Sequence, residues 1–190
     1  MKYKTILADP PWQYQNKGVE GAAEKHYPTM KKHELRGLNV EAISTPETVL
    51  IMWATWPLVD EAIALGTAWG FSYVTGFPWV KLQLSPTFDL FGEPHIVPTY
   101  GTGFWVRGCS EPIFIFKRKE AKVPATDFLG LISERMKHSK KPASIYHYAE
   151  TSFQSPRVEL FARQKRDGWD SIGNGIDGKD IREVLGVVKV

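Results

Sequence analysis

Short apolar runs alternate along this chain with amphipathic stretches that follow a helical period. Five runs are apolar enough to form buried strands, at residues 5–8, 48–55, 71–81, 112–117 and 157–162. Strands separated by amphipathic helices are typical of β-α units that feed a single parallel sheet. The pattern therefore predicts an α/β fold with a mostly parallel sheet.

The clearest helical pattern spans residues 57–69. Its first residue is a proline, which suits a first turn, and Gly70 suits its end. Its apolar side chains recur on one helical face, at Leu58, Ala62, Leu65 and Trp69. Three further helices are expected, at residues 31–38, 126–136 and 142–150. Thr126 would cap the second of these.

Two segments, 13–25 and 82–103, are polar or contain several prolines and glycines, and we expect both to form long loops. Long loops are uncommon in compact domains unless they serve as lids or binding surfaces. In a parallel sheet they would flank the carboxyl ends of the strands, where ligands bind. Both loops are therefore expected to border a ligand site.

The composition bounds the size of the protein. A chain of 190 residues with 43% hydrophobic and 24% charged content is long enough for one well-buried core and short for two. We therefore expect residues 1–190 to form a single domain. No stretch approaches the roughly 20 apolar residues of a membrane span. The N-terminus runs straight into a predicted strand instead of a signal peptide, so a soluble, cytoplasmic protein without a membrane partner is expected.

Charge and cysteine content exclude some classes of site. The formal charge of +3 is mildly basic and is compatible with a polyanionic partner without requiring one. The single cysteine, Cys109, excludes an internal disulfide and a cysteine-rich zinc cluster. The histidines show no pair spacing that suits a metal, so no metal site is expected.

The tetrapeptide Asp9-Pro10-Pro11-Trp12 directly follows the first predicted strand. Both proline rings fix φ, so the direction of the Pro10 carbonyl is set before any ligand arrives. The Asp9 carboxylate and this carbonyl could accept hydrogen bonds from a flat amine, and Trp12 could offer a ring face to a nucleobase. A tight turn without chemistry is the alternative reading of these four residues.

Further motifs follow in a fixed order. They are Tyr27-Pro28-Thr29-Met30, Trp79-Val80-Lys81, Ser139-Lys140-Lys141-Pro142, Glu159-Leu160-Phe161-Ala162-Arg163 and Gly173-Asn174. Together with Asp9-Pro10-Pro11-Trp12, this set resembles the MT-A70 family of adenine N6-methyltransferases. That family includes bacterial and phage DNA enzymes and the eukaryotic messenger-RNA writers. The resemblance covers residues 6–178.

The resemblance implies a Rossmann-like fold of S-adenosylmethionine-dependent methyltransferases, with helices on both faces of the sheet. It also implies a permuted motif order, in which the reaction motif comes first and the cofactor half comes late in the chain. The residues that it assigns to catalysis are Asp9, Pro10, Pro11 and Trp12.

The cofactor that the resemblance implies is S-adenosylmethionine. Its contacts are assigned to Asp9, Lys141, Glu159, Leu160, Phe161, Arg163 and Asn174. Lys141 suits the methionine carboxylate by charge, whereas Arg163 and Asn174 suit the ribose hydroxyls. Gly175 stands where the eukaryotic enzymes usually have glutamine, and Lys165 stands where they have histidine. Some ribose contacts are therefore expected to differ from those of the eukaryotic enzymes.

On the substrate side, Tyr27 resembles the aromatic lip that covers the target base in this family. Trp79 and Lys81 close a predicted strand beside the expected pocket, so both are candidate substrate contacts. For Lys81, a side chain that extends along apolar surface is nearly as good an explanation.

The resemblance implies a nucleic-acid partner. DNA is favoured, because a single small domain resembles the bacterial and phage members more closely than the multi-subunit RNA writers. Two alternatives stay open, namely the same reaction on RNA and a non-catalytic nucleic-acid-binding partner subunit. Cytosine methylation is disfavoured, because it usually accompanies a serine at the position of Asp9. The sequence specifies neither a recognition site nor an oligomeric state.

Overall fold

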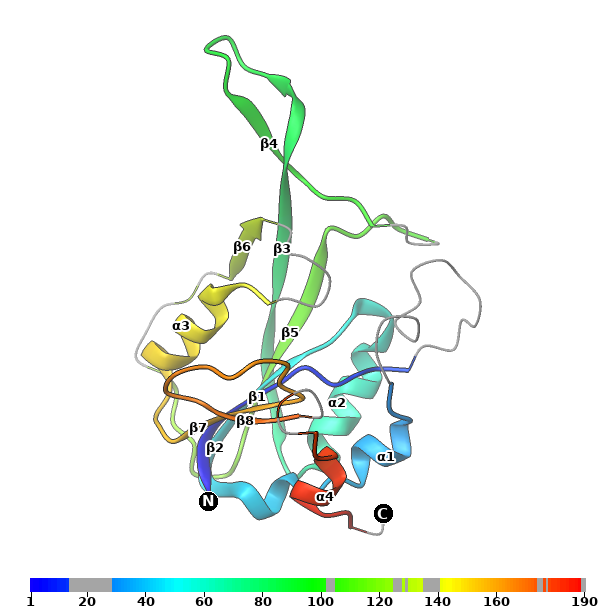
Figure 1. Cartoon of the computed structure of the whole chain (residues 1–190), viewed down its shortest axis with the longest axis vertical. Helices are drawn as coiled ribbons and strands as arrows, with labels where there is room; N and C mark the ends of the chain where they lie inside the picture. The colour runs from blue at the N-terminus through cyan, green and yellow to red at the C-terminus, as the bar shows by residue number, and fades with distance from the viewer. Residues whose placement is uncertain are drawn as a thin grey trace.

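The computed structural model describes residues 1–13, 29–101, 105–124, 128, 130–134, 141–173, 176 and 178–188. Its strands are β1 (Tyr3–Ala8), β2 (Ser44–Trp53), β3 (Ser72–Phe88), β4 (Pro94–Pro98), β5 (Ser110–Lys117), β6 (Leu131–Glu134), β7 (Arg157–Leu160) and β8 (Asp170–Ile172). Its helices are α1 (Lys32–Arg36), α2 (Val59–Ala68), α3 (Ala143–Ser152) and α4 (Ile181–Leu185), with short 3-10 turns η2 (Val40–Ile43) and η3 (Trp56–Leu58). Figure 1 shows their arrangement.

Within the described residues, the strands form one eight-stranded sheet in the order β4-β3-β5-β2-β1-β7-β8, and β6 pairs with β3. The pairs β1–β2, β1–β7, β7–β8 and β3–β6 are parallel. The pairs β2–β5, β3–β5 and β3–β4 are antiparallel. The sheet is therefore mixed, and only β4 and β5 run against the direction of the other strands. The α/β architecture that the sequence predicts is confirmed.

Two separate apolar cores lie on the two faces of the sheet. On one face, Leu35 of α1, Leu65 of α2 and Leu185 of α4 pack against alternate residues of the central strands, including Ile6 and Leu50. On the other face, the buried side chains of α3 pack against the intervening residues, such as Leu7, Ile51 and Ile113. Successive side chains of a strand point to opposite faces, so each central strand serves both cores. The predicted coverage of both faces by helices is thus confirmed.

The predicted helix at 126–136 is wrong over the part of that segment that is described. Residues 131–134 instead form β6, which pairs in parallel with β3. Leu131 is buried, whereas the next residue, Ile132, is 68% exposed, so burial changes with a period of two. Trp79 pairs with both Glu111 and Leu131, which places β6 on the edge of β3 that β5 leaves open. An open sheet edge, supplied by distant sequence, outweighs the local helical pattern.

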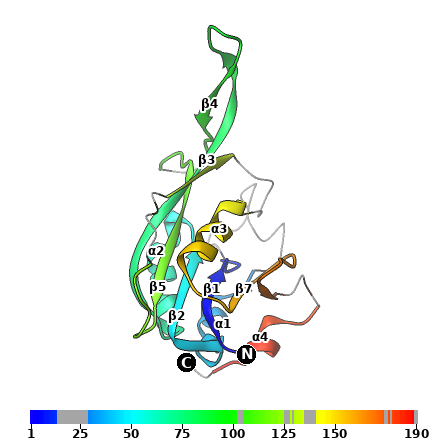
Figure 2. The same ribbon diagram turned by 90° about the vertical axis from the view of Figure 1, so that its left-hand side faces the viewer.

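The prediction of a loop at 82–103 is also wrong, because most of this segment forms a β-hairpin. Strand β3 continues to Phe88, and β4 returns antiparallel to it. This arm projects beyond the other described elements in both views (Figures 1 and 2). Its prolines stand at the ends of β4 and at the irregularity between Leu84 and Phe88, where the ladder does not need their missing N–H groups. The 13–25 loop lies almost wholly outside the described residues.

The remaining predicted elements are confirmed with small changes of boundary. The helical pattern at 57–69 corresponds to η3 and α2, and those at 31–38 and 142–150 correspond to α1 and α3. None of the helices that the structure describes is long and apolar enough to cross a membrane.

Candidate active site at the carboxyl end of β1

The site is built around Asp9, the first residue after β1. Ala8, the last residue of β1, pairs with Met52 of β2 on one side and with Leu160 of β7 on the other. Asp9 therefore lies between the residues that follow those partners, Trp53 and Phe161. All three strands run in the same direction, so Asp9 stands at their shared carboxyl edge, where ligands bind in open α/β sheets.

The backbone after Asp9 makes a tight, hydrogen-bonded turn. The Trp12 N–H donates to the Pro10 carbonyl at 2.8 Å, and the Met30 N–H donates to the Pro11 carbonyl at 3.0 Å. Pro10 itself is buried. A carbonyl oxygen has two lone pairs, so the Pro10 carbonyl retains one acceptor position in a fixed direction.

Trp12 differs from the expectation drawn from the sequence. Its side chain is 7% exposed and belongs to the core on the α2 face. Its indole N–H donates to the Trp53 carbonyl at 3.3 Å. The ring thus offers little surface to a nucleobase, and the stacking role expected for Trp12 is wrong for this structure. The chain folds back after the two prolines, and Trp12 anchors the turn to β2.

Lys141 brings the end of β1 together with the start of α3. Its ammonium nitrogen lies 3.1 Å from Asp9 Oδ2 and 3.6 Å from Glu111 Oε2. The same nitrogen lies 4.4 Å from the centre of the Trp53 ring, within the range of a cation–π contact. Lys141 immediately precedes Pro142, the N-cap of α3, so the helix start fixes its backbone. The structure therefore places the two predicted residues Asp9 and Lys141 in direct contact.

Glu111 is the residue of this cluster that sequence reasoning missed. Its carboxylate accepts from Lys81 Nζ, and it accepts from the Trp53 indole N–H at 2.8 Å. Burial disfavours the charged form, but the positive charges of Lys141 and Lys81 outweigh it and hold the pKa of Glu111 below its usual range. Glu111 is thus a carboxylate kept ionised by two lysines.

The two candidate substrate residues on β3 are arranged as a pair. Lys81 Nζ lies 4.7 Å from the centre of the Trp79 ring. Trp79 is 3% exposed, and its indole N–H donates to Ser133 Oγ at 2.8 Å. Its ring meets Trp53 edge to face, at 5.6 Å between centroids. Trp79 is therefore too buried to contact substrate and instead packs against Lys81. Of the two residues, Lys81 is the one that remains a candidate for direct contact with substrate.

Glu159 has an unused acceptor. Its Oε1 accepts from the Tyr146 hydroxyl at 2.9 Å, whereas Oε2 is buried and has no hydrogen-bond partner in the described structure. Burial and the nearby charge of Asp9 raise the pKa of Glu159, against the opposing effects of Tyr146, Arg166 and Lys141. A buried carboxylate oxygen without a partner is unusual and fits a site that a ligand donor completes.

The residues after Glu159 shape the end of β7. Leu160 is fully buried in the core, so only its backbone can face a ligand. Phe161 has a φ of 62°, uncommon for a residue other than glycine, and it stacks on Trp69. A side chain on Gly173 would place its Cβ 2.3 Å from the Ala162 carbonyl oxygen, so the chain can pass β7 this closely only at a glycine.

Three other predicted site residues are less informative. Arg163 is exposed on the segment after β7. Tyr27 and Asn174 lie outside the described residues. Among the residues that the structure does describe, no three histidine, cysteine, aspartate or glutamate side chains are grouped so as to hold a metal ion.

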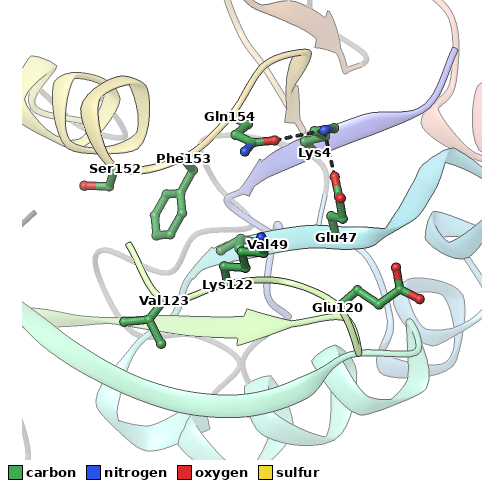
Figure 3. Close-up of a pocket in the computed structure, with 9 residues that line it drawn as sticks. All are labelled: Lys4, Glu47, Val49, Glu120, Lys122, Val123, Ser152, Phe153 and Gln154. Carbon is green, nitrogen blue, oxygen red and sulfur yellow. Dashed lines mark hydrogen bonds and ion pairs between the residues drawn. The ribbon is translucent and has the colours of Figure 1, made fainter. Parts of the chain in front are cut away.

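A pocket of about 290 Å³ lies at the opposite end of the sheet from Asp9. Figure 3 shows its lining, which includes Lys4 near the start of β1 and Glu47 of β2. These two side chains pair at 2.7 Å, and Lys4 also donates to Gln154 at 2.8 Å. The pocket contains none of the predicted site residues.

Comparison with known proteins bears on the chemistry of the Asp9 site. The family model described as MT-A70 matches residues 3–175. The type II methyltransferase M.MunI from a Mycoplasma species is 31% identical over 195 residues, which cover 90% of this chain and 77% of that protein. A putative N(6)-adenosine-methyltransferase, MT-A70-like, from Medicago truncatula is 31% identical, with 93% of this chain and 27% of that protein covered. Human METTL4, named as an N(6)-adenine-specific methyltransferase, is 26% identical, with 92% and 37% covered. The chain therefore spans most of the bacterial relative and less than two fifths of these eukaryotic ones.

Proposed function

Because the chain belongs to the MT-A70 family of S-adenosylmethionine-dependent adenine N6-methyltransferases, we propose that it methylates the exocyclic amine of adenine in DNA. The observation that carries the proposal is the contact between Asp9 and Lys141 at the carboxyl end of β1. It joins the residue proposed to hold the amine to a residue proposed to hold the cofactor.

The described residues fit S-adenosylmethionine. Oε2 of Glu159 is buried and has no hydrogen-bond partner among the described residues, so it is suited to accept a hydrogen bond from a cofactor hydroxyl or ammonium group. Lys141 supplies a positive charge for the cofactor carboxylate, and the exposed Arg163 supplies donors for ribose hydroxyls. When bound, the cofactor supplies a methyl group that its sulfonium already activates. The remaining proposed cofactor contacts are Leu160, Phe161 and Asn174.

In the proposed reaction, Asp9 and the Pro10 carbonyl orient the amine. Each accepts one hydrogen of the planar amino group, and the turn fixes both oxygens in advance. When the nitrogen bonds to the methyl carbon, the bond from that carbon to the cofactor sulfur would break, and the sulfur would leave as a neutral thioether. The nitrogen becomes positively charged, and the Asp9 carboxylate stabilises that charge until one N–H proton is released to Asp9 or to water. Most of the gain comes from holding the two reactants in line, since orientation alone supplies a large part of such barriers.

DNA is the proposed substrate because the alignment with this chain covers 77% of the type II methyltransferase M.MunI but only 27% of the plant adenosine methyltransferase. In duplex DNA the target adenine must leave the base stack to reach Asp9, which costs a few kcal/mol. Lys81 pairs with Glu111, which also contacts Lys141 beside Asp9, and Lys81 is proposed to contact the extruded nucleotide or its phosphate.

The test is incubation of the protein with labelled S-adenosylmethionine and an equimolar mixture of unmethylated DNA and RNA of random sequence. Digestion to nucleosides and mass spectrometry would identify the product. N6-methyldeoxyadenosine is the expected product. N6-methyladenosine would move the substrate to RNA, and methylcytosine would refute the proposed base. Label in no nucleoside, together with no cofactor heat in a calorimetric titration, would favour the non-catalytic partner subunit.

A further inference from the structure

Glu111 reaches the site because β5 runs against its neighbours. It is the second residue of β5 and pairs with Trp79 of β3. The amino end of an antiparallel strand lies at the same edge as the carboxyl ends of β1 and β2. Glu111 is thereby placed at the same edge of the sheet as Asp9, although it belongs to none of the sequence motifs.

Every described partner of the Glu111 carboxylate is a donor from the site. Lys81 binds Oε1, whereas the Trp53 indole and Lys141 share Oε2. Its side chain is 24% exposed, and that of Lys141 is 13% exposed. Lys141 is therefore held between two carboxylates, those of Glu111 and Asp9.

The four charged groups of this cluster balance one another. Asp9 and Glu111 carry two negative charges, and Lys81 and Lys141 carry two positive charges. Without the charge on Glu111, the cluster would carry one excess positive charge in a partly buried site. That charge would act against the positive charge that develops on a methylated amine.

We propose that Glu111 is a positioning residue for methyl transfer, which holds Lys141 and Lys81 in place and offsets their charge so that Asp9 stays available to the amine. The inference rests on the proposed function. In this arrangement Lys141 divides its attraction between two carboxylates, so it does not fully neutralise Asp9. Removal of the Glu111 charge leaves Asp9 as the one carboxylate within ion-pair distance of Lys141 Nζ among the described residues.

A purely structural role for Glu111 predicts a different pattern of variants. If Glu111 only fills space and satisfies Trp53, then Glu111→Gln should be nearly neutral, and any second change in the cluster should add its own loss. If charge balance matters, removal of a lysine should repair part of the damage. The double variant Glu111→Gln/Lys81→Met has the wild-type sum of charges.

The test measures single-turnover rate constants with saturating labelled S-adenosylmethionine and the DNA or RNA that wild-type protein methylates. Glu111→Gln should lower the rate constant at least about tenfold while the cofactor Kd changes by less than about threefold. The double variant should be at least about threefold faster than Glu111→Gln, although its substrate KM should rise because Lys81 is lost. The matched control is Glu41→Gln, which removes a paired glutamate (Arg118, 2.7 Å) and should behave as wild type.

Wild-type rates in Glu111→Gln, or a double variant no faster than Glu111→Gln, would overturn the inference. Circular dichroism of each variant separates these outcomes from unfolding. Glu111→Asp keeps the charge and should stay within about threefold of wild type. A folded Glu111→Asp protein that is as slow as Glu111→Gln would also count against the role.

A second readout does not depend on activity. Acetic anhydride labelling followed by mass spectrometry compares the reactivity of Lys81 in wild type and in Glu111→Gln, and faster labelling in the variant is expected. Equal labelling would show that Glu111 does not hold Lys81 and would overturn the inference. If wild-type protein methylates neither DNA nor RNA, the proposed function fails by itself, while the labelling still tests the contacts of Glu111.

Discussion

Lys141 Nζ lies 3.1 Å from Asp9 Oδ2, so one ion pair joins the end of β1 to the start of α3. Both side chains are largely shielded, with 13% of Lys141 and 27% of Asp9 exposed. Charge-assisted contacts at such sites are short and directional, and they fix both groups relative to the sheet. The pair therefore sets the direction in which the Asp9 carboxylate presents its other oxygen.

Replacement of Asp9 by asparagine is expected to abolish methyl transfer. The amide offers one acceptor without a negative charge, so the nitrogen of the acceptor base loses its charge stabilisation, and a loss of about 100-fold or more in the rate constant is expected. The cofactor Kd, measured by calorimetry, should change much less. The control is Asp60→Asn, on the exposed first turn of α2, which should keep the wild-type rate. Full activity of Asp9→Asn would remove Asp9 from the reaction.

The buried position of Trp12 leads to a prediction about stability. Trp12→Ala removes a large core side chain and the hydrogen bond to the Trp53 carbonyl, so the free energy of unfolding should fall by about 3–5 kcal/mol. Urea denaturation gives this value. Trp105→Ala is the matched control, because Trp105 is 99% exposed and its loss should change little. A Trp12→Ala protein that is as stable as wild type but binds nucleic acid more weakly would support stacking of Trp12 on a base instead of a role in the core.

The course of the central strands could be predicted from the sequence because each carries a strong local pattern. The runs at 5–8 and 112–117 send alternate side chains into the two cores, as strands buried on both faces do. In the run at 157–162, the apolar residues Val158 and Leu160 alternate with the charged residues Arg157 and Glu159, which is the period-two pattern of a strand. Strand β6 could not be predicted, since it pairs with an edge of β3 that lies far away in sequence. The β3–β4 arm is a local hairpin, but its prolines and glycines give it the composition of a loop.

The difference between local sequence patterns and contacts distant in sequence also explains which site residues could be predicted. Asp9 and Lys141 belong to short motifs that also specify their position at the edge of the sheet. Glu111 lies in a strand whose antiparallel direction leaves no local signature, so its arrival beside Lys141 requires the topology. Trp12 was found as part of a motif, but its burial is decided by how the chain returns over β2 after the two prolines.

Glu159 predicts a pH dependence of stability. Its pKa is raised in the folded protein, chiefly by burial and then by the charge of Asp9. The folded state therefore binds this proton more tightly than the unfolded state does. Its contribution to stability is fully present below the ordinary glutamate pKa of about 4.3 and is lost as pH rises through the raised value. Each pKa unit of elevation corresponds to about 1.4 kcal/mol.

Urea denaturation between pH 4 and pH 8 measures this effect. The wild-type protein should lose more unfolding free energy over that range than the Glu159→Gln variant, which has no charge to bury. Glu183→Gln, at an exposed position on α4, should follow the wild-type curve. Identical pH profiles for wild type and Glu159→Gln would mean that Glu159 titrates as an ordinary surface carboxyl.

The apolar residues at the tip of the β3–β4 arm are expected to contribute little to the free energy of unfolding. Leu90 and Phe91, at its tip, are 101% and 90% exposed, so they bury no surface on folding of one chain. The double variant Leu90→Ser/Phe91→Ser should change the free energy of unfolding by less than about 0.5 kcal/mol. In contrast, Leu65→Ser places a hydroxyl at a position that is 1% exposed and should cost several kcal/mol. Urea denaturation of the wild type, the arm double variant and Leu65→Ser, each at two protein concentrations, tests this prediction. A large loss in the arm variant that grows with protein concentration would show that the tip is buried between chains.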